Sequence, residues 1–135
     1  IDYPPRSRNE DLAAFMRQIG VCEELGTGVD RALGEIALYQ LPAPKFERYE
    51  DSTRITLYDR RPLKDMTLDD RVRACFQHCA LRFVENGRMT NGSLRERLNI
   101  NKSNYPAATD IINETIKRGL VKESDKPKEY VPFWA

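Results

Sequence analysis

The 135-residue sequence lacks long apolar runs, and its uninterrupted hydrophobic segments extend over only a few residues. A transmembrane helix needs about 20 apolar residues and a signal-peptide core about 7–15, so the sequence predicts neither. Its three cysteines, Cys22, Cys75 and Cys79, are too few for a disulfide framework and favour a reducing compartment. We therefore expect a cytoplasmic protein that makes no membrane contact.

Histidine is nearly absent as well, since His78 is the only one, and no nucleophile motif surrounds it. A hydrolytic triad therefore has no support. The helical spacing of Cys75, His78 and Cys79 would suit a metal site. Both cysteines, however, lie in an apolar stripe with Val72 and Phe76, and no fourth ligand follows at a suitable spacing. We expect buried thiols, and the sequence predicts neither a metal site nor an enzyme.

An excess of charge is also missing, because 22 Lys/Arg and 21 Asp/Glu leave a net charge of +1. Such a balance does not by itself indicate a nucleic-acid partner. The distribution is uneven: residues 1–66 carry 10 basic and 12 acidic side chains, and residues 67–135 carry 12 and 9. The basic excess of the second half is a weak indication of nucleic-acid binding.

A charged, proline-containing stretch without periodicity, residues 59–66, divides the chain and is typical of a linker. Before it, helical and then alternating apolar spacing predicts two helices and a hairpin. These elements are a helix between an N-cap at Asn9 and a stop at Gly20, a helix over 28–39, and strands over 46–49 and 53–58. Two helices and one hairpin supply few apolar residues for a hydrophobic core, so we expect residues 1–58 to cover a sheet outside this sequence.

After the linker, residues 67–135 show a sharper helical pattern. Its elements are a helix capped by Thr67 and ended by Asn86-Gly87, a helix over 91–98 with a capping box at Ser93–Glu96, a turn over 99–101, a helix over 105–118, and strands over 120–122 and 130–131. In the last helix we expect five residues to face inward: Ala108, Ile111, Ile112, Thr115 and Ile116. We expect three aromatic residues to anchor the C-terminal strand on the helices: Tyr130, Phe133 and Trp134. This order predicts a winged helix-turn-helix, and an α+β fold for the whole chain.

In such a domain the helix after the tight turn enters the major groove of duplex DNA, and its first residues meet the base edges. Asparagine bonds adenine bidentately, serine and threonine bond bases or phosphates, and lysine neutralises phosphates. The candidate residues on this helix are Lys102, Ser103, Asn104, Tyr105, Thr109 and Asn113. Lys122, Lys126 and Lys128 on the following hairpin, the wing, are candidates for backbone contacts.

Plainer interpretations remain open. Asparagine and serine before a helix are often only caps, and lysines on a hairpin are often only solvated. Asp110 and Glu114 on the same helix would repel phosphates unless they face away. Winged helices also serve as protein–protein modules, so a homodimer is the alternative partner.

Several short motifs in the first 46 residues occur together in a known protein family. These motifs are Pro5-Arg6-Ser7-Arg8-Asn9, Leu12-Ala13, Gly20, Glu23-Glu24, Gly26-Thr27-Gly28, Arg31 and Leu41-Pro42-Ala43-Pro44-Lys45-Phe46. This set resembles the C-terminal part of bacterial regulators known as RecG-related ATP-dependent DNA helicases. In that family an AlbA/Schlafen-like divergent AAA domain precedes a histidine-kinase-type ATPase-like domain, often followed by a winged helix. The closing residues 130–135 are also similar to the end of such chains. The resemblance implies a transcriptional regulator, although no helicase motif is visible.

In the resembling family, Gly26-Thr27-Gly28 aligns with the second glycine box of the ATPase fold. Glycines before a helix expose backbone N–H groups that can hold a phosphate. The fold also needs an upstream helix bearing an asparagine and an earlier glycine turn, which this sequence does not include, and Asp30 stands where glycine is usual. A tight turn is the plainer interpretation. We expect no cofactor in this fragment, and the resemblance implies ATP only for the full-length protein.

Overall fold

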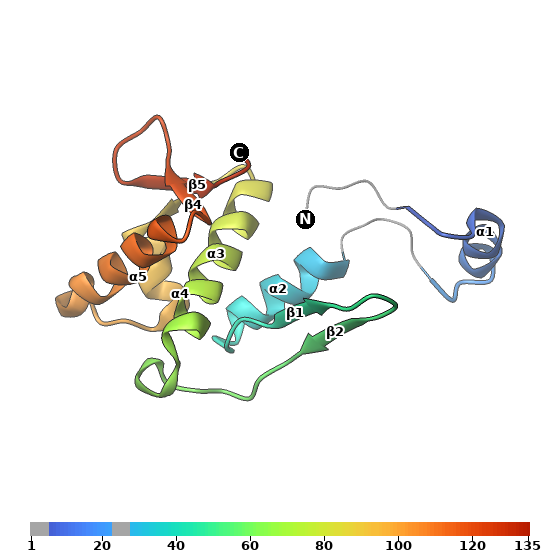
Figure 1. The fold of residues 1–135 in the computed structure, drawn as a ribbon, viewed down its shortest axis with the longest axis horizontal. Helices are drawn as coiled ribbons and strands as arrows, with labels where there is room; N and C mark the ends of the chain where they lie inside the picture. The colour runs from blue at the N-terminus through green and yellow to red at the C-terminus, as the bar shows by residue number, and fades with distance from the viewer. Residues whose placement is uncertain (1–5, 23–27) are drawn as a thin grey trace.

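The computed structural model describes residues 6–22 and 28–135 and has an α+β architecture (Figure 1). Its helices are α1 (Glu10–Gln18), α2 (Gly28–Leu38), α3 (Leu68–Val84), α4 (Asn91–Leu98) and α5 (Tyr105–Lys117), with 3-10 turns η1 (Leu63–Asp65) and η2 (Lys102–Asn104). Its strands are β1 (Lys45–Arg48), β2 (Thr53–Thr56), β3 (Met89–Thr90), β4 (Val121–Glu123) and β5 (Glu129–Pro132). They form antiparallel sheets of order β1-β2 and β3-β5-β4. The predicted α+β class is confirmed. None of the described helices has the length and apolar character of a membrane span.

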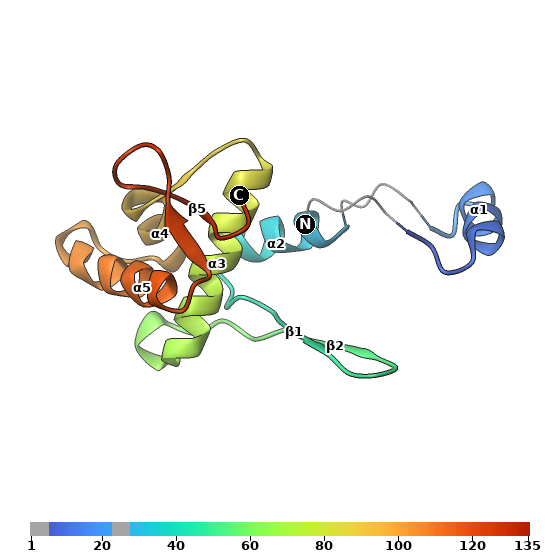
Figure 2. The same cartoon turned by 45° about the horizontal axis from the view of Figure 1, so that its top comes forward.

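Helix α1 has the ends that the sequence predicts. The side-chain oxygen of Asn9 accepts a hydrogen bond from the Leu12 amide at 2.9 Å, and Gly20 follows the helix at a φ of +74°. Figures 1 and 2 both show α1 apart from the other elements. Its side chains Leu12 and Phe15 are exposed. The apolar side of α1 is thus uncovered, and the sheet that we expect it to cover remains a prediction.

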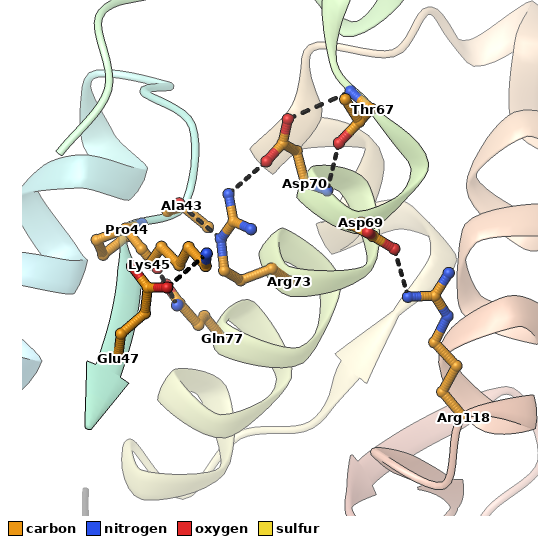
Figure 3. A network of polar contacts seen from close by, with 10 residues as sticks. All are labelled: Ala43, Pro44, Lys45, Glu47, Thr67, Asp69, Asp70, Arg73, Gln77 and Arg118. Carbon is orange, nitrogen blue, oxygen red and sulfur yellow. Dashed lines mark hydrogen bonds and ion pairs between the residues drawn. The ribbon is translucent and has the colours of Figure 1, made fainter. Parts of the chain in front are cut away.

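Helix α2 packs against α3 instead of against a sheet of its own, and it buries Leu33. The segment that follows α2 is fixed to α3 by two hydrogen bonds to backbone oxygens (Figure 3). Arg73 Nε donates to the Ala43 oxygen at 3.0 Å, and Gln77 Nε2 donates to the Pro44 oxygen at 2.7 Å. Because Ala43 is buried within the core cluster, the first half of the chain contributes to the core of the second.

The stretch predicted as a linker, residues 59–66, is attached to the rest of the structure near its end. It contains η1, and its Met66 side chain is buried in the core while Leu63 packs against it. Arg71 Nη2 donates to the Leu63 oxygen at 2.8 Å and holds η1 on the first turn of α3. Two apolar side chains and this hydrogen bond attach the charged stretch to the core. Where the chain divides into domains stays a prediction.

Helix α3 begins with a capping box at the predicted residue. Thr67 Oγ1 accepts from the Asp70 amide at 3.1 Å, and Asp70 Oδ2 accepts from the Thr67 amide at 3.3 Å (Figure 3). Burial alone would raise the pKa of Asp70, but hydrogen bonds from Arg73 and Thr67 outweigh it and lower the pKa. Asp70 therefore stays charged and stabilises the first turn of α3.

The main core lies between α3, α4 and α5. Its wholly buried side chains include Cys75, Cys79, Met89, Leu94 and Ala108. The prediction for α4 was wrong in one detail, because its capping box pairs Thr90 with Ser93 and not Ser93 with Glu96. The inward prediction for Ile116 was also wrong: this side chain is 37% exposed, since it lies at the edge of the α5 stripe.

The hairpin of β4 and β5 is anchored on α3 by aromatic contacts, as the sequence predicts. The Phe76 and Phe133 rings stack with centroids 6.5 Å apart, and Phe83 meets Trp134 edge-on at 5.2 Å. The third strand, β3, was not predicted because it is only two residues long. The chain order α3, β3, α4, α5, β4, β5 agrees with the order expected of a winged helix, and that finer assignment stays a prediction.

Candidate nucleic-acid interface

The turn between α4 and α5 is built from asparagines that adopt turn conformations. Asn99 ends α4 in the left-handed region at a φ of 52°, which asparagine tolerates better than most residues. Ile100 is buried, and Asn101 Oδ1 then accepts from the Ser103 amide at 3.0 Å to start η2. This turn sets the direction in which α5 leaves α4.

The N-terminal end of α5 is open to solvent. Lys102, Ser103, Asn104 and Tyr105 are all exposed, and Tyr105 retains 61% of its accessible surface. The first turn of α5, which lies wholly within the described residues, contains no acidic side chain. A nucleic-acid backbone could approach this end without meeting a negative charge on that turn.

Asn104 and Ser103 differ in whether their side chains already make hydrogen bonds within the described chain. Asn104 occupies the N-cap position of α5, but its side chain makes no capping hydrogen bond, nor any other found among residues 6–22 and 28–135. The Ser103 hydroxyl, by contrast, donates to Asn101 Oδ1 at 3.0 Å. Asn104 thus presents its amide to solvent, whereas Ser103 partly serves the turn.

Thr109 lies one turn further along α5 and joins it to α4. Asn91 Nδ2 donates to Thr109 Oγ1 at 2.9 Å and to the Tyr105 oxygen at 3.2 Å. Arg95 Nε in turn donates to Asn91 Oδ1 at 2.9 Å. The sequence reasoning missed Asn91 and Arg95, although their separation of four residues on one helix face was a usable signal. Thr109 therefore holds the helix pair together, and its contact with a base stays a prediction.

The remaining polar residues of α5 lie beyond this contact. Asn113 is exposed and follows Thr109 by four residues, which places both on one face of the helix. Of the two acidic residues that would repel phosphates, Glu114 is paired with Arg118 at 2.9 Å. Figure 3 shows that Arg118 also reaches Asp69, at 2.6 Å. Asp110 is exposed and unneutralised by any ion pair found in the described part of the chain.

The wing lysines are not equivalent. Lys122 Nζ donates to the Ala135 oxygen at 2.5 Å, while Lys126 and Lys128 extend into solvent near the tip of the hairpin. An open hollow of about 540 Å³ lies between the hairpin and the turn that precedes β3. Its charged lining residues are Arg88, Lys122, Lys126, Glu123, Asp125 and Glu129. Because these three basic and three acidic side chains balance, the hollow offers an approaching phosphate little net attraction, and Lys128, which does not line it, adds a positive charge near the tip.

The cysteine and histidine side chains of α3 serve the core. Burial raises the pKa of Cys75 and of Cys79 to about 12, so both are neutral thiols and poor metal ligands. His78 Nε2 lies 3.1 Å from Ser93 Oγ and links α3 to α4. Within the described ranges, no group of three or more His, Cys, Asp or Glu side chains could hold a metal ion.

Of the glycine-box residues, Gly26 and Thr27 lie outside the described residues. Gly28 is the first residue of α2 and is exposed. A Cβ atom built on Gly28 would meet no atom of residues 6–22 and 28–135 within 4 Å, so packing against these residues does not require glycine there. The structure therefore gives Gly28 no role beyond the start of α2, and nucleotide binding at this segment stays a prediction.

Comparison with known families identifies the first segment of the chain. The family model described as "Putative ATP-dependent DNA helicase recG C-terminal" matches residues 1–57. The search of curated proteins and the search of solved structures each found no match. The predicted resemblance of the first segment to RecG-related, ATPase-like proteins is confirmed. The match does not extend to residues 67–135, so the function of this part rests on its own geometry.

Proposed function

We propose that residues 67–135 form a winged helix-turn-helix that binds duplex DNA and acts in transcriptional control. The observation that carries this proposal is the exposed start of α5, where Asn104 has an unused amide and no acid occupies the first turn. In helix-turn-helix proteins this end of the second helix contacts base edges in the major groove. The chain is then a DNA-binding protein of the cytoplasm rather than an enzyme.

The side chains take different parts in this proposal. Asn104 reads a base, since an asparagine amide matches the N6 and N7 edge of adenine. Lys102, two residues earlier, neutralises a phosphate, and Lys126 and Lys128 at the tip of the wing contact the backbone. Tyr105 and Asn113 complete the face toward the groove. ATP belongs to this proposal only through the longer protein that the matched family implies.

Two alanine variants test the assignment of the helix end. Lys102→Ala is expected to weaken binding to all duplexes alike. It should also reduce the slope of log K against log salt by about 1, because the variant neutralises one phosphate fewer and so releases about one counterion fewer on binding. Asn104→Ala is expected to reduce the preference for the selected site by about 1–3 kcal/mol while leaving the salt slope unchanged. Both are measured by fluorescence anisotropy on duplexes chosen from a random pool, at several salt concentrations.

Lys64→Ala is the matched control, because Lys64 is an exposed lysine of η1 and belongs neither to α5 nor to the turn before it. It is expected to change the salt slope by less than Lys102→Ala. Equal behaviour of all three variants, or unchanged binding to every duplex, would show that α5 does not enter the groove.

A second candidate function is self-association through the first half of the chain. Leu12, Phe15 and Ile19 on and beside α1 are more than half exposed, and the paired strand residues Phe46 and Ile55 are also exposed. Apolar surface of this kind favours burial against a second copy. In sedimentation velocity, Phe15→Glu should shift a concentration-dependent dimer to monomer, whereas Gln18→Glu on the same helix should not. A monomer at all concentrations removes this candidate.

A further inference from the structure

A hollow of about 180 Å³ lies where three separate segments of the chain meet. The segment after α2 lines one side, the stretch before α3 another, and the end of α4 the third. Its lining residues are Gln40, Leu41, Pro42, Arg60, Arg61, Pro62, Leu63, Met66, Arg97, Leu98 and Asn99. Three of these side chains are arginines and none is acidic. Since one water takes about 30 Å³ of liquid volume, the hollow has room for a small polyatomic group.

Arg97 is the most unusual member of the lining. It lies in the last turn of α4 with only 9% of its surface exposed, and its Nη2 donates to the Leu41 oxygen at 2.7 Å. No carboxylate pairs with it among residues 6–22 and 28–135. Burial lowers the pKa of this guanidinium, as expected for a cation taken out of water without a counterion. The dipole of α4 and one carbonyl offset only part of that cost.

Arg60 and Arg61 bring two further cations to the mouth of the hollow. Both are exposed, and no ion pair involves either within the described chain. The neighbouring Asp59 makes no ion pair with either arginine within the described chain, and its Oδ1 accepts the Arg60 backbone amide at 2.7 Å. The Arg61 guanidinium stacks over the Tyr58 ring at 5.4 Å, which orients it while its N–H groups remain available.

We propose that this hollow binds a phosphate group through Arg60, Arg61 and Arg97. The planar guanidinium fork matches phosphate oxygens bidentately, and a dianion or monoanion supplies the charge that the three arginines lack. Gln40 and Asn99 also line the hollow, and Gln40 Nε2 already donates to the Glu96 oxygen at 3.4 Å. The buried arginine gives the site depth, and the two exposed arginines allow entry.

The phosphate has two candidate sources. Asn99 lines the hollow and also begins the turn that leads to Lys102, so a backbone phosphate of duplex DNA bound at α5 would lie near this site. That source rests on the proposed function. A free phosphate, or the phosphate of a small metabolite, needs no DNA and would make the hollow a ligand site of its own.

The variant Arg60→Gln/Arg61→Gln tests the site without disturbing the core, because both side chains are exposed. Arg97 is left in place, since its bond to the Leu41 oxygen holds the first half of the chain on α4. Lys64→Gln is the control, as an exposed cation from the same stretch that does not line the hollow. All three proteins are used as the whole 135-residue chain.

In the first arm, inorganic phosphate replaces chloride at constant ionic strength and pH. The Arg97 Nε–Hε signal and the Asn99 amide signal should shift and saturate. In the double variant the affinity should fall about tenfold for each charge-assisted bond removed, and in Lys64→Gln it should not change. In the second arm, binding of duplex DNA is measured against salt, and the double variant should lose about one unit of slope.

The two arms separate the sources of phosphate. An effect in both arms, or in the DNA arm alone, identifies a backbone phosphate. An effect of free phosphate without any change in the DNA slope identifies a small ligand, and this arm holds even when α5 binds no DNA. The proposal is overturned when neither arm responds, or when Lys64→Gln reduces binding as much as the double variant.

Discussion

Replacing Leu94 with alanine is expected to lower the free energy of unfolding by about 2–5 kcal/mol. Leu94 lies on α4, is 0% exposed and belongs to the core cluster shared with α3 and α5. Truncation removes three buried carbons and leaves a cavity, because a packed core collapses only partly around it. Urea unfolding followed by far-UV circular dichroism measures the change in the free energy of unfolding. It is obtained from the shift in the midpoint urea concentration, provided that the dependence of the free energy on urea concentration has the same slope in both proteins.

Leu57→Ala is the matched control, since it makes the same chemical change at a side chain that is 71% exposed after β2. Its stability should change by no more than about 0.5 kcal/mol. The comparison matters for function because α4 carries the turn that orients α5. A small domain is stable by only about 5–15 kcal/mol, so Leu94→Ala should also weaken duplex binding. Equal stability of the two variants would contradict the core described here.

The free energy of unfolding is also expected to fall by about 2 kcal/mol between pH 7 and pH 5, owing to His78. Burial chiefly, and then the positive charges of Arg97 and Arg82, lower the pKa of His78 from 6.5 to about 4. Above pH 6.5 the imidazole is neutral in both states. As the pH falls from 6.5 to 4, the unfolded chain takes up a proton that the folded chain does not, so stability is lost across this window.

His78→Gln provides the control for this pH dependence. Glutamine keeps a donor and an acceptor near Ser93 but does not titrate, and His78 is the only histidine of the chain. Denaturant unfolding of the variant should therefore give nearly the same free energy at pH 7 and pH 5. Asp70, whose pKa is lowered, contributes its own loss of stability at still lower pH. A profile that falls equally in both proteins would assign the effect to carboxylates instead.

Most helix ends could be predicted from local sequence. The caps at Asn9 and Thr67 and the positive-φ stop at Gly20 depend on a few neighbouring residues, and the structure has them where the sequence places them. The capping box of α4 was misplaced because the observed box has Ser93 at its third helical position, where the usual motif has Glu or Gln, so only Ser93–Glu96 matched the pattern. The strand β3 could not be predicted, since a two-residue strand has no periodicity and exists only by pairing with β5.

The position of the candidate interface could be predicted from the sequence, but which of its polar side chains are free to bind a ligand could not. The exposed residues from Lys102 to Tyr105 follow from the turn and the helix start alone. The sequence could not distinguish Asn104, whose amide is unused, from Thr109, whose hydroxyl is bonded to Asn91, because that bond joins residues 18 positions apart. The basic hollow was missed for the same reason, since Arg60 and Arg97 meet only in the folded chain.

The sequence by itself determined the helices, their ends, the hairpins, the resemblance of residues 1–57 and the polar character of the start of α5. These features depend on spacing and on side chain to backbone bonds within a few residues. Only the tertiary structure decided that α2 and residues 41–44 pack on α3 and that η1 joins the core. It also decided that three arginines share one hollow without a carboxylate. Contacts between distant segments are set by which buried surfaces fit together, and that fit leaves no periodic signal along the chain.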